Sequence, residues 1–325
     1  MHRSSGRRFG RKQGKRRPAR RDDLYRMQSA MEYLMTYGWA ILVIAVVLGV
    51  LFQLGVFGGA NLAPKATPGS CEVQHTTAGA SLAGMCQGEM PQYVASFPVQ
   101  NCISGSAFSG AWATVQSIEG LQSSVTVSAW VNDRGYETVH MQGVLGNEQL
   151  NTFQAPGFQL ALNWGEYNAI FIVDGNYITN IGSAPSISID KWYMVSGTYN
   201  STTGEMALYL DDTLYSSNTV NTGAVTSSGP YVLGADAWSV LSPGVYCDIF
   251  NGTIANVQLY NTSLSSSEIN ALYQEGIGGA PVRPQNIVGW WPLNSNANDY
   301  SGSNNNGQAN DIGYTSFWTN GYTAP

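Results

Sequence analysis

Positive charge is scarce in most of this sequence. Eleven of the fifteen Lys and Arg residues lie within residues 3–26, and the other four are Lys65, Arg134, Lys191 and Arg283. Nineteen of the twenty-one Asp and Glu residues follow residue 26. The chain therefore consists of a basic first segment and a long acidic remainder. Only the basic segment has the clustered cations that neutralise the phosphates of a nucleic acid.

Histidine and paired catalytic acids are also rare. The only histidines are His2, His75 and His140, and no H-E-x-x-H or G-x-S-x-G pattern occurs. Retaining glycosidases need two carboxylates about 5 Å apart, but the sequence has neither E-x-D-x-E nor E-x-D-x-x-E. Without a base or a paired acid, general acid–base catalysis has no candidate residues. The sequence therefore predicts a protein that is not an enzyme and names no certain cofactor.

One long run has no charge at all, from Tyr33 to Phe57. As a helix it would be about 37 Å long, enough to cross a bilayer, and it exceeds the apolar core of about 7–15 residues in a secretory signal. The basic segment stands directly before it, as the positive-inside rule expects of a cytoplasmic flank. This position favours a membrane flank over a nucleic-acid arm and predicts that the acidic part is extracellular.

The stretch that leads into this run, "QSAMEYLMTYGWAILVI", resembles the leader and first helix of archaeal type IV pilins, whose class III signal peptide is cut before Q-S-A-x-E. The resemblance implies that residues 1–27 are a basic cytoplasmic leader, cut between Met27 and Gln28. It also implies that residues 28–57 form a transmembrane and filament helix, in which Glu32 pairs with the α-amino group of a neighbouring subunit. The family usually has Gly or Ala before the cut, so an uncleaved single-pass anchor is the alternative.

Four cysteines, Cys71, Cys86, Cys102 and Cys247, lie on the predicted exported side, where disulfides persist. Four cysteines allow three pairings. We favour Cys71–Cys86, which closes a short loop, together with Cys102–Cys247. A metal site is the alternative, although no C-x₂-C or paired His accompanies the cysteines. Residues 58–91, rich in Gly, Pro and small residues at their start, are interpreted as a linker with a cysteine loop.

Residues 92–276 contain many short runs of β-branched and aromatic residues bounded by Gly, Asn, Asp or Pro, such as "VTVSAWV" and "FQLAL". This pattern predicts a β-sandwich. One helix is expected near its end, with Ser265 as N-cap, Glu268 as its capping-box partner and Gly276 as the stop.

Three segments resemble the laminin-G-like, concanavalin A-like jelly roll: "SSVTVSAWV", "KWYMVSGTYNSTTGEMALYLDDTL" and "FNGTIANVQLYNTSLSSSEINALYQ". The resemblance implies a mainly β sandwich that binds a glycan or a protein. Trp130, Trp192 and Tyr260 are expected in its core rather than at a ligand, since large aromatic residues dominate such cores.

The segment "IVGWWPLNSNANDYSGSNNNGQ" resembles the opening of the same domain, yet it begins only at Ile287. We interpret this as circular permutation, with residues 277–286 as a linker and 287–325 completing the jelly roll. Gly289–Leu293 is then expected to form a strand antiparallel to Gly252–Tyr260, with one or both of Trp290 and Trp291 buried. A truncated second domain is the alternative, but so short a segment cannot bury a core of its own.

Two kinds of modification or ligand site are suggested by short patterns. The side chains of Asn294, Asn296, Asn298 and Asp299 resemble the spacing of a calcium loop, although a polar Asn/Gly turn explains the same residues. Where the family often has Asp, this chain has Ala255 and Asn256, which weakens the calcium interpretation. Three sequons begin at Asn200, Asn251 and Asn261 and predict surface glycosylation.

Together these features predict a pilin-like protein of the cell membrane and surface that carries a lectin-like sandwich on its extracellular side. It would act as a filament subunit or as an adhesin for glycans or proteins. The expected partners are the membrane, other copies of the chain through the N-terminal helix, and a glycan or surface-protein ligand, but not nucleic acid. An anchored lectin-like receptor and a secreted glycan-processing enzyme are the alternatives.

Overall fold

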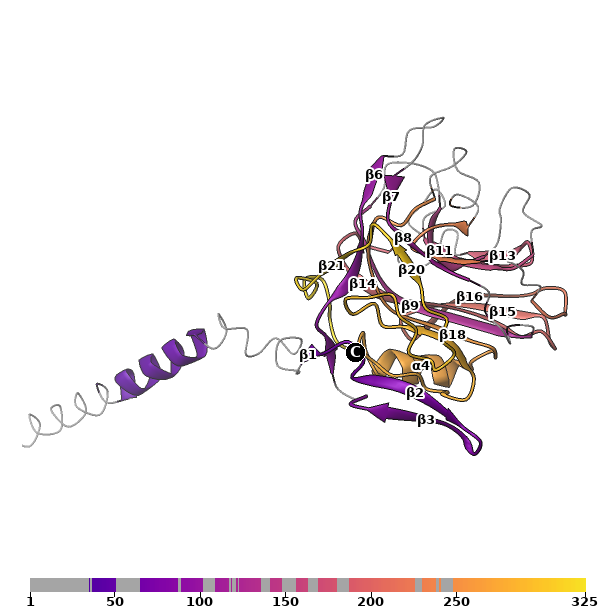
Figure 1. Cartoon of the computed structure of the whole chain (residues 1–325). Coiled ribbons are helices and arrows are strands. Elements are labelled where there is room, and N and C mark those ends of the chain that lie inside the picture. The colour runs from indigo at the N-terminus through magenta and orange to yellow at the C-terminus, as the bar shows by residue number, and fades with distance from the viewer. Residues whose placement is uncertain are drawn as a thin grey trace, which may run out of the picture. The chain divides into compact units, whose positions relative to one another are not determined.

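The computed structural model describes residues 35, 37–50, 65–86, 89–101, 109–116, 118, 121, 123–135, 141–147, 156–162, 169–179, 187–225, 230–237, 240 and 248–325. The chain divides into two compact units, Met1–Gly58 and Gly59–Pro325 (Figure 1). The predicted cleavage site at Met27 and Gln28, the predicted assembly residue Glu32, and Cys102 and Cys247 lie outside the described residues.

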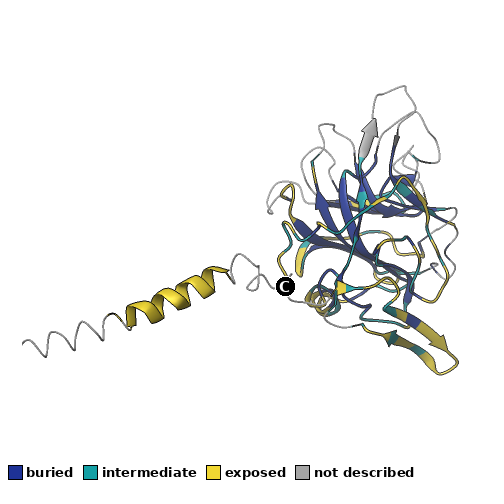
Figure 2. Cartoon of the chain, turned by 60° about the vertical axis from the view of Figure 1, so that its left-hand side comes forward, coloured by how far each residue is buried: buried dark blue, intermediate teal, exposed yellow. Residues whose placement is uncertain are grey.

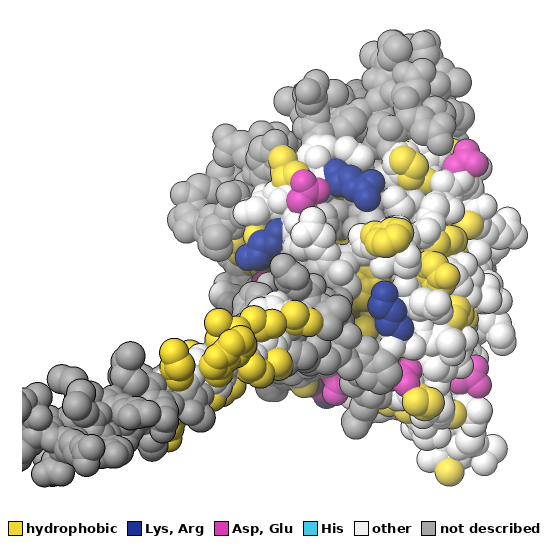
Figure 3. Space-filling model, turned by 90° about the vertical axis from the view of Figure 1, so that its left-hand side faces the viewer, with side chains coloured by type: hydrophobic (Ala, Val, Ile, Leu, Met, Phe, Trp, Pro, Cys, Tyr) yellow, Lys and Arg dark blue, Asp and Glu magenta, His cyan; other side chains and the backbone are white. Residues whose placement is uncertain are grey.

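In the first unit, residues 37–50 are helical and every one of them is exposed (Figure 2). Its large side chains are apolar, and Trp39 and Ile41 expose 69% and 64% of their surface. Hydrophobic side chains cover the helix in the space-filling view (Figure 3). A helix that is apolar all round is normally covered by protein or lipid. Among the described residues, no helix is both long enough and apolar enough to span a bilayer.

The second unit is a sandwich of two β-sheets, as the strand pattern predicted, and it is mainly β in content (Figure 1). One sheet has seven described strands, in the spatial order β13 (Asn176–Thr179), β12 (Ala169–Val173), β11 (Phe158–Leu162), β10 (Gln142–Gly146), β17 (Tyr231–Leu233), β8 (Trp112–Val115) and β20 (Gln308–Asn310).

The other sheet has eight described strands. Seven follow the order β16 (Thr213–Thr219), β15 (Glu205–Leu210), β14 (Trp192–Tyr199), β9 (Val125–Asp133), β18 (Gly252–Tyr260), β5 (Val94–Phe97) and β21 (Gly313–Thr315), and β19 (Ile287–Trp291) also pairs with β18. The inner faces of the two sheets share one large apolar core, which includes Phe171 and Trp291. A core formed between the inner faces of two packed sheets is what a β-sandwich requires.

Two short strands share one edge of β18. Its first residues pair with β5, with Gly252 opposite Phe97, and its last residues pair with β19, with Tyr260 opposite Ile287. Both pairings are antiparallel. The predicted pairing of the late segment with Gly252–Tyr260 is therefore confirmed. The strand spans Ile287–Trp291 rather than Gly289–Leu293, because Pro292 has no N–H to continue the ladder.

The two adjacent tryptophans of β19 are both buried, on opposite faces of the sheet. Trp291 is fully buried in the core between the sheets, and Trp290 exposes 3% of its surface in a second core outside the eight-stranded sheet. Neighbouring side chains in a strand point to opposite faces. The prediction that at least one of them is buried is confirmed, and both sheet faces depend on this short strand.

The second core is covered by the helix α4 (Ser266–Gln274). Ser265 caps it and Glu268 completes the capping box, as predicted. Tyr273 of this helix stacks on Trp130 of β9, with ring centroids 5.7 Å apart. The predicted core positions of Trp130, Trp192 and Tyr260 are confirmed, since each exposes less than 5% of its surface.

A disulfide-closed hairpin adds to the same side of the domain. It consists of β2 (Cys71–Thr76) and β3 (Gly79–Gly84), and the predicted Cys71–Cys86 bridge is present. Val73 is buried in the second core, and β1 (Lys65–Ala66) pairs in parallel with β4 (Met90–Pro91). Residues 65–86 are thus part of the folded domain rather than the linker predicted for residues 58–91. A further small pair is formed by β6 (Val99–Asn101) and β7 (Ser109–Gly110).

Candidate functional site

The larger of two described pockets, here called the polar cleft, lies where the two sheets meet at one end of the sandwich. It has a volume of about 220 Å³. One wall is the turn between β12 and β13, and the other is the segment that follows β16. Its lining residues are Val173, Asp174, Asn176, Tyr199, Val220, Asn221, Thr222, Gly223 and Ala224.

The first wall is a tight Asp-Gly turn. Val173 pairs with Asn176, and the two residues between them, Asp174 and Gly175, have φ of 45° and 76°. Asp-Gly is favoured in such two-residue hairpins because both central residues must adopt positive φ. The Asp174 carboxylate accepts a hydrogen bond of 2.8 Å from the backbone N–H of Gly157. This contact fixes the carboxylate at the rim of the cleft.

The second wall is held by Tyr199, the last residue of β14. Its hydroxyl lies 2.9 Å from the carbonyl oxygen of Asn221 and 2.8 Å from that of Gly223, and can donate to either. Burial raises the pKa of Tyr199, and the negative charge of Asp174 raises it further. The hydroxyl therefore keeps its proton at neutral pH. The side chains of Asn221 and Thr222 remain exposed beside it.

The chemistry of the polar cleft suits a small, neutral, hydroxyl-rich ligand. Its lining has one carboxylate, together with amide side chains, hydroxyl side chains and backbone groups. These groups can both accept and donate hydrogen bonds. Its volume is below the roughly 300–1,000 Å³ of pockets for drug-sized ligands. We therefore expect room for one sugar-sized ring rather than for an extended molecule.

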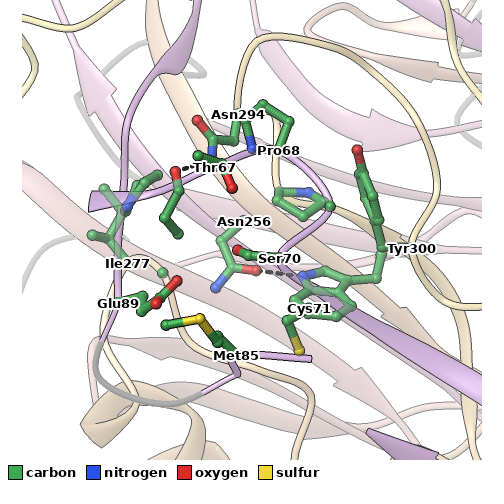
Figure 4. Close-up of a pocket in the computed structure, with 16 residues that line it drawn as sticks. Thr67, Pro68, Ser70, Cys71, Met85, Glu89, Asn256, Ile277, Asn294 and Tyr300 are labelled. Atoms are coloured by element: carbon green, nitrogen blue, oxygen red, sulfur yellow. Dashed lines mark hydrogen bonds between the residues drawn. The ribbon is translucent and has the colours of Figure 1, made fainter. Parts of the chain in front are cut away.

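A second pocket, here called the Glu89 cavity, lies between the disulfide hairpin and the sandwich (Figure 4). It is smaller, at about 40 Å³. Its lining comes from the segment around β1 and β2, from β18 and β19, and from the loop after α4. These residues are Ala66, Thr67, Pro68, Gly69, Ser70, Cys71, Met85, Glu89, Pro91, Asn256, Ile277, Gly278, Trp290, Pro292, Asn294 and Tyr300.

A hydrogen-bond network fixes one side of the Glu89 cavity. The side-chain oxygen of Asn256 accepts bonds from the Trp290 indole N–H at 2.8 Å and from the Gln258 amide at 3.0 Å. Its amide group donates to the carbonyl of Gly279 at 2.8 Å. Asn256 has a positive φ of 49° at the bulge in β18, a conformation that Asn tolerates better than most residues. A Cβ at Gly278 would lie 2.1 Å from the carbonyl oxygen of Glu89, so the loop after α4 can approach only with glycine there.

The predicted calcium residues form a hydrogen-bonded turn. The Asp299 carboxylate accepts four bonds of 2.8 Å, from the N–H groups of Trp290, Ser301 and Asn305 and from the Ser301 hydroxyl. Asn294 and Asn296 also bond within the chain: their side-chain oxygens accept from the N–H groups of Tyr93 and Asn298, and their amides donate to Ala66 and Tyr300.

These residues do not fit a calcium ion. Four donors surround the only carboxylate, whereas calcium needs six to eight oxygen ligands with free lone pairs. In the described part of the chain, no three His, Cys, Asp or Glu side chains come together in a metal-binding group. The polar turn, which was the alternative interpretation, describes what Asn294, Asn296, Asn298 and Asp299 do in this structure.

The three sequon asparagines are all partly buried at the ends of strands. The Asn251 amide donates a 2.6 Å bond to the carbonyl of Gly135, so its nitrogen is already engaged. Asn200 and Asn261 use their side-chain oxygens as acceptors, from Thr202 and from Asn286. Glycosylation at the three sites stays a prediction, and the structure favours Asn200 and Asn261 over Asn251.

Comparison with known proteins agrees with this architecture. Residues 108–270 match the model of the family described as the concanavalin A-like lectin/glucanases superfamily. The chain belongs to this superfamily. Its name covers both binding proteins and hydrolases, so membership alone does not decide between the two. No curated protein sequence matches the chain.

Solved structures that resemble this one have very different sequences. A candidate carbohydrate-binding protein from Bacteroides ovatus aligns over 73% of this chain and 67% of its own, with 13% identity and a TM-score of 0.52. A heptameric SAP-like pentraxin from Limulus polyphemus aligns over 69% of this chain and 94% of its own, with 14% identity and a TM-score of 0.48. At 13% identity the first likeness shows the superfamily fold and not a shared ligand.

Proposed function

We propose that this chain displays a carbohydrate-binding domain at the cell surface, and that the polar cleft is where the carbohydrate binds. The cleft carries the proposal, because its carboxylate, amides and backbone groups sit around a space that fits one sugar ring. The superfamily includes lectins, and the Bacteroides ovatus structure of the same fold is a candidate carbohydrate-binding protein. Binding without hydrolysis is the activity that we expect.

The charge of Asp174 gives the proposal a test. We expect binding to glycans with neutral terminal pyranoses and not to sialylated glycans, since two carboxylates repel each other. Asp174→Asn keeps the turn, because Asn tolerates positive φ and can still accept from Gly157, but it removes the charged acceptor. We expect the affinity for a neutral glycan to fall about tenfold, the value of one strong hydrogen bond.

The measurement is binding of the exported domain to an array of immobilised neutral and sialylated glycans. Asp190→Asn is a matched control, because Asp190 is exposed, has a φ of 58° and does not line the cleft. Undiminished binding by Asp174→Asn, or binding to sialylated glycans alone, would show that the polar cleft is not the site.

We further propose that the N-terminal part is a pilin-like filament or anchor segment, which places the domain outside the cell membrane. The apolar residues 37–50 and the pattern around Glu32 support this proposal. We expect the cellular protein to begin at Gln28 and the Glu32→Ala chain to stay in the membrane without assembling. Sequencing of the N-terminus and electron microscopy of surface filaments measure the two outcomes. A protein that still begins at Met1 would favour the uncleaved, anchored lectin-like receptor.

A further inference from the structure

We propose that the Glu89 cavity binds a primary ammonium group, of the kind that ends a lysine side chain. This proposal does not depend on the glycan site, because the two pockets share no lining residue. It follows from the charge, the hydrogen-bonding groups and the size of the cavity.

The cavity contains one carboxylate and no cation. Glu89 is the only acidic residue among its lining residues, and Figure 4 shows its carboxylate at the same space as Ser70 and Asn256. Within the described residues, the ion pair in the domain joins Arg283 to Glu268 and does not involve Glu89. A partly buried carboxylate without a partner favours a cationic ligand.

The neighbouring groups suit an ammonium ion in particular. An ammonium group has three N–H donors and no acceptor. The Glu89 carboxylate and the hydroxyls of Thr67 and Ser70 can accept all three, and these residues surround the cavity in Figure 4. The rings of Trp290 and Tyr300 also line it. Aromatic rings attract a cation placed over their faces.

The size of the cavity excludes larger cations. A water molecule needs about 10–15 Å³ of such space, so a cavity of about 40 Å³ holds a short chain of roughly three small groups. This suits an ammonium group and the methylenes next to it, which would contact Ile277, Met85 and Pro292. A sugar ring would not fit.

The walls are held in place before any ligand arrives. The Cys71–Cys86 bridge closes the hairpin beside the cavity, and the backbone of Met85 donates a hydrogen bond to the carbonyl of Ser70. Asn294 ties the segment at Ala66 to the loop after β19. Such preorganisation lowers the entropic cost of binding.

Neither lysine of this domain lines the cavity. Residues 59–325 contain two lysines, Lys65 and Lys191. Lys65 is exposed on β1, and the Lys191 ammonium lies 4.9 Å from the ring centroid of Tyr193. The other two lysines of the chain, Lys12 and Lys15, belong to the predicted cytoplasmic leader. The occupant that we infer is therefore a lysine of a second polypeptide.

The test uses n-butylammonium, which copies the end of a lysine side chain, with n-butanol as the neutral probe of the same shape. The indole N–H of Trp290 forms part of the cavity wall and serves as the reporter in ¹H–¹⁵N spectra. We expect its signal to shift with n-butylammonium, with a dissociation constant on the order of 1 mM, and to stay in place with n-butanol. An equal shift with both probes, or no shift with either, overturns the proposal.

Variants of two glutamates complete the test. Glu89→Gln keeps the shape and removes the charge, and we expect at least about tenfold weaker binding. Glu72→Gln, on the exposed face of β2, should bind as the unchanged chain does. Binding retained in Glu89→Gln, with an unchanged melting temperature, would overturn the proposal. Nα-acetyl-lysine methylamide distinguishes a lysine of a polypeptide from a free small amine as the source of the ammonium group. Binding of this probe supports the lysine. If n-butylammonium binds and this probe does not, a lysine as the source is overturned.

Discussion

Deleting residues 287–325 is expected to abolish cooperative folding of the sandwich. The deletion removes β19, β20 and β21, which pair with β18, β8 and β5. It also removes Trp290 and Trp291 from two separate cores, and truncating one buried Trp costs about 3–5 kcal/mol. Because a whole domain is stable by only about 5–15 kcal/mol, little stability would remain. Thermal unfolding followed by circular dichroism measures the effect.

A rearranged chain is the matched control for this deletion. Residues 287–325 are joined through a flexible linker to the start of residues 59–286, so that every strand is present in the order expected of an unpermuted domain. We expect this chain to melt cooperatively, near the temperature of the natural order. A truncated chain that melts like the full domain would contradict both the pairing of β19 and the interpretation as a permutation.

Replacing Asp299 with Ala is expected to lower the free energy of unfolding by at least about 3 kcal/mol. The carboxylate accepts four hydrogen bonds, and each bond to a charged acceptor is worth about 1.5–3 kcal/mol. For a domain of this size a loss of about 3 kcal/mol corresponds to a melting temperature lower by roughly 6 °C. Differential scanning calorimetry of residues 59–325 provides the measurement.

Two controls separate this structural role from calcium binding. Asn298→Ala changes an exposed side chain of the same loop and should leave the melting temperature almost unchanged. We also expect the unchanged domain to melt at the same temperature in the presence of calcium and of a chelator. A melting temperature that rises with calcium in the unchanged domain, but not in Asp299→Ala, would restore the calcium interpretation.

The fold could be predicted because its signals are local. The strands alternate in their own sequence, the box of Ser265 and Glu268 spans three residues, and the adjacent tryptophans of β19 mark a strand buried on both faces. The Cys71–Cys86 bridge also closes a short loop. The packing of Val73 against the sandwich could not be seen, because a hairpin of small and polar residues resembles a linker.

The candidate sites were not predicted, because they are made by residues far apart in the sequence. The polar cleft joins Asp174 to Tyr199 and to backbone carbonyls of residues 221 and 223, which have no side-chain signature. The hydrogen bonding of the suggested calcium residues could not be predicted for a related reason. One of the donors to the Asp299 carboxylate is the backbone N–H of Trp290. The spacing of side chains in a sequence cannot reveal such a backbone donor.

The edge of β18 that β5 and β19 share also constrains the order in which the domain can form. β5 lies near the start of the domain, but the strands beside it, β18 and β21, come from its last part. The Asn294 side chain even holds the backbone of Tyr93, across a separation of 201 residues. Such distant contacts slow folding, and chains emerge from the ribosome or a membrane channel N-terminus first. Every molecule must therefore pass through an interval in which its apolar strand segments are synthesised but cannot yet fold, and its yield in the cell will depend on how well those segments are shielded until the final strands arrive.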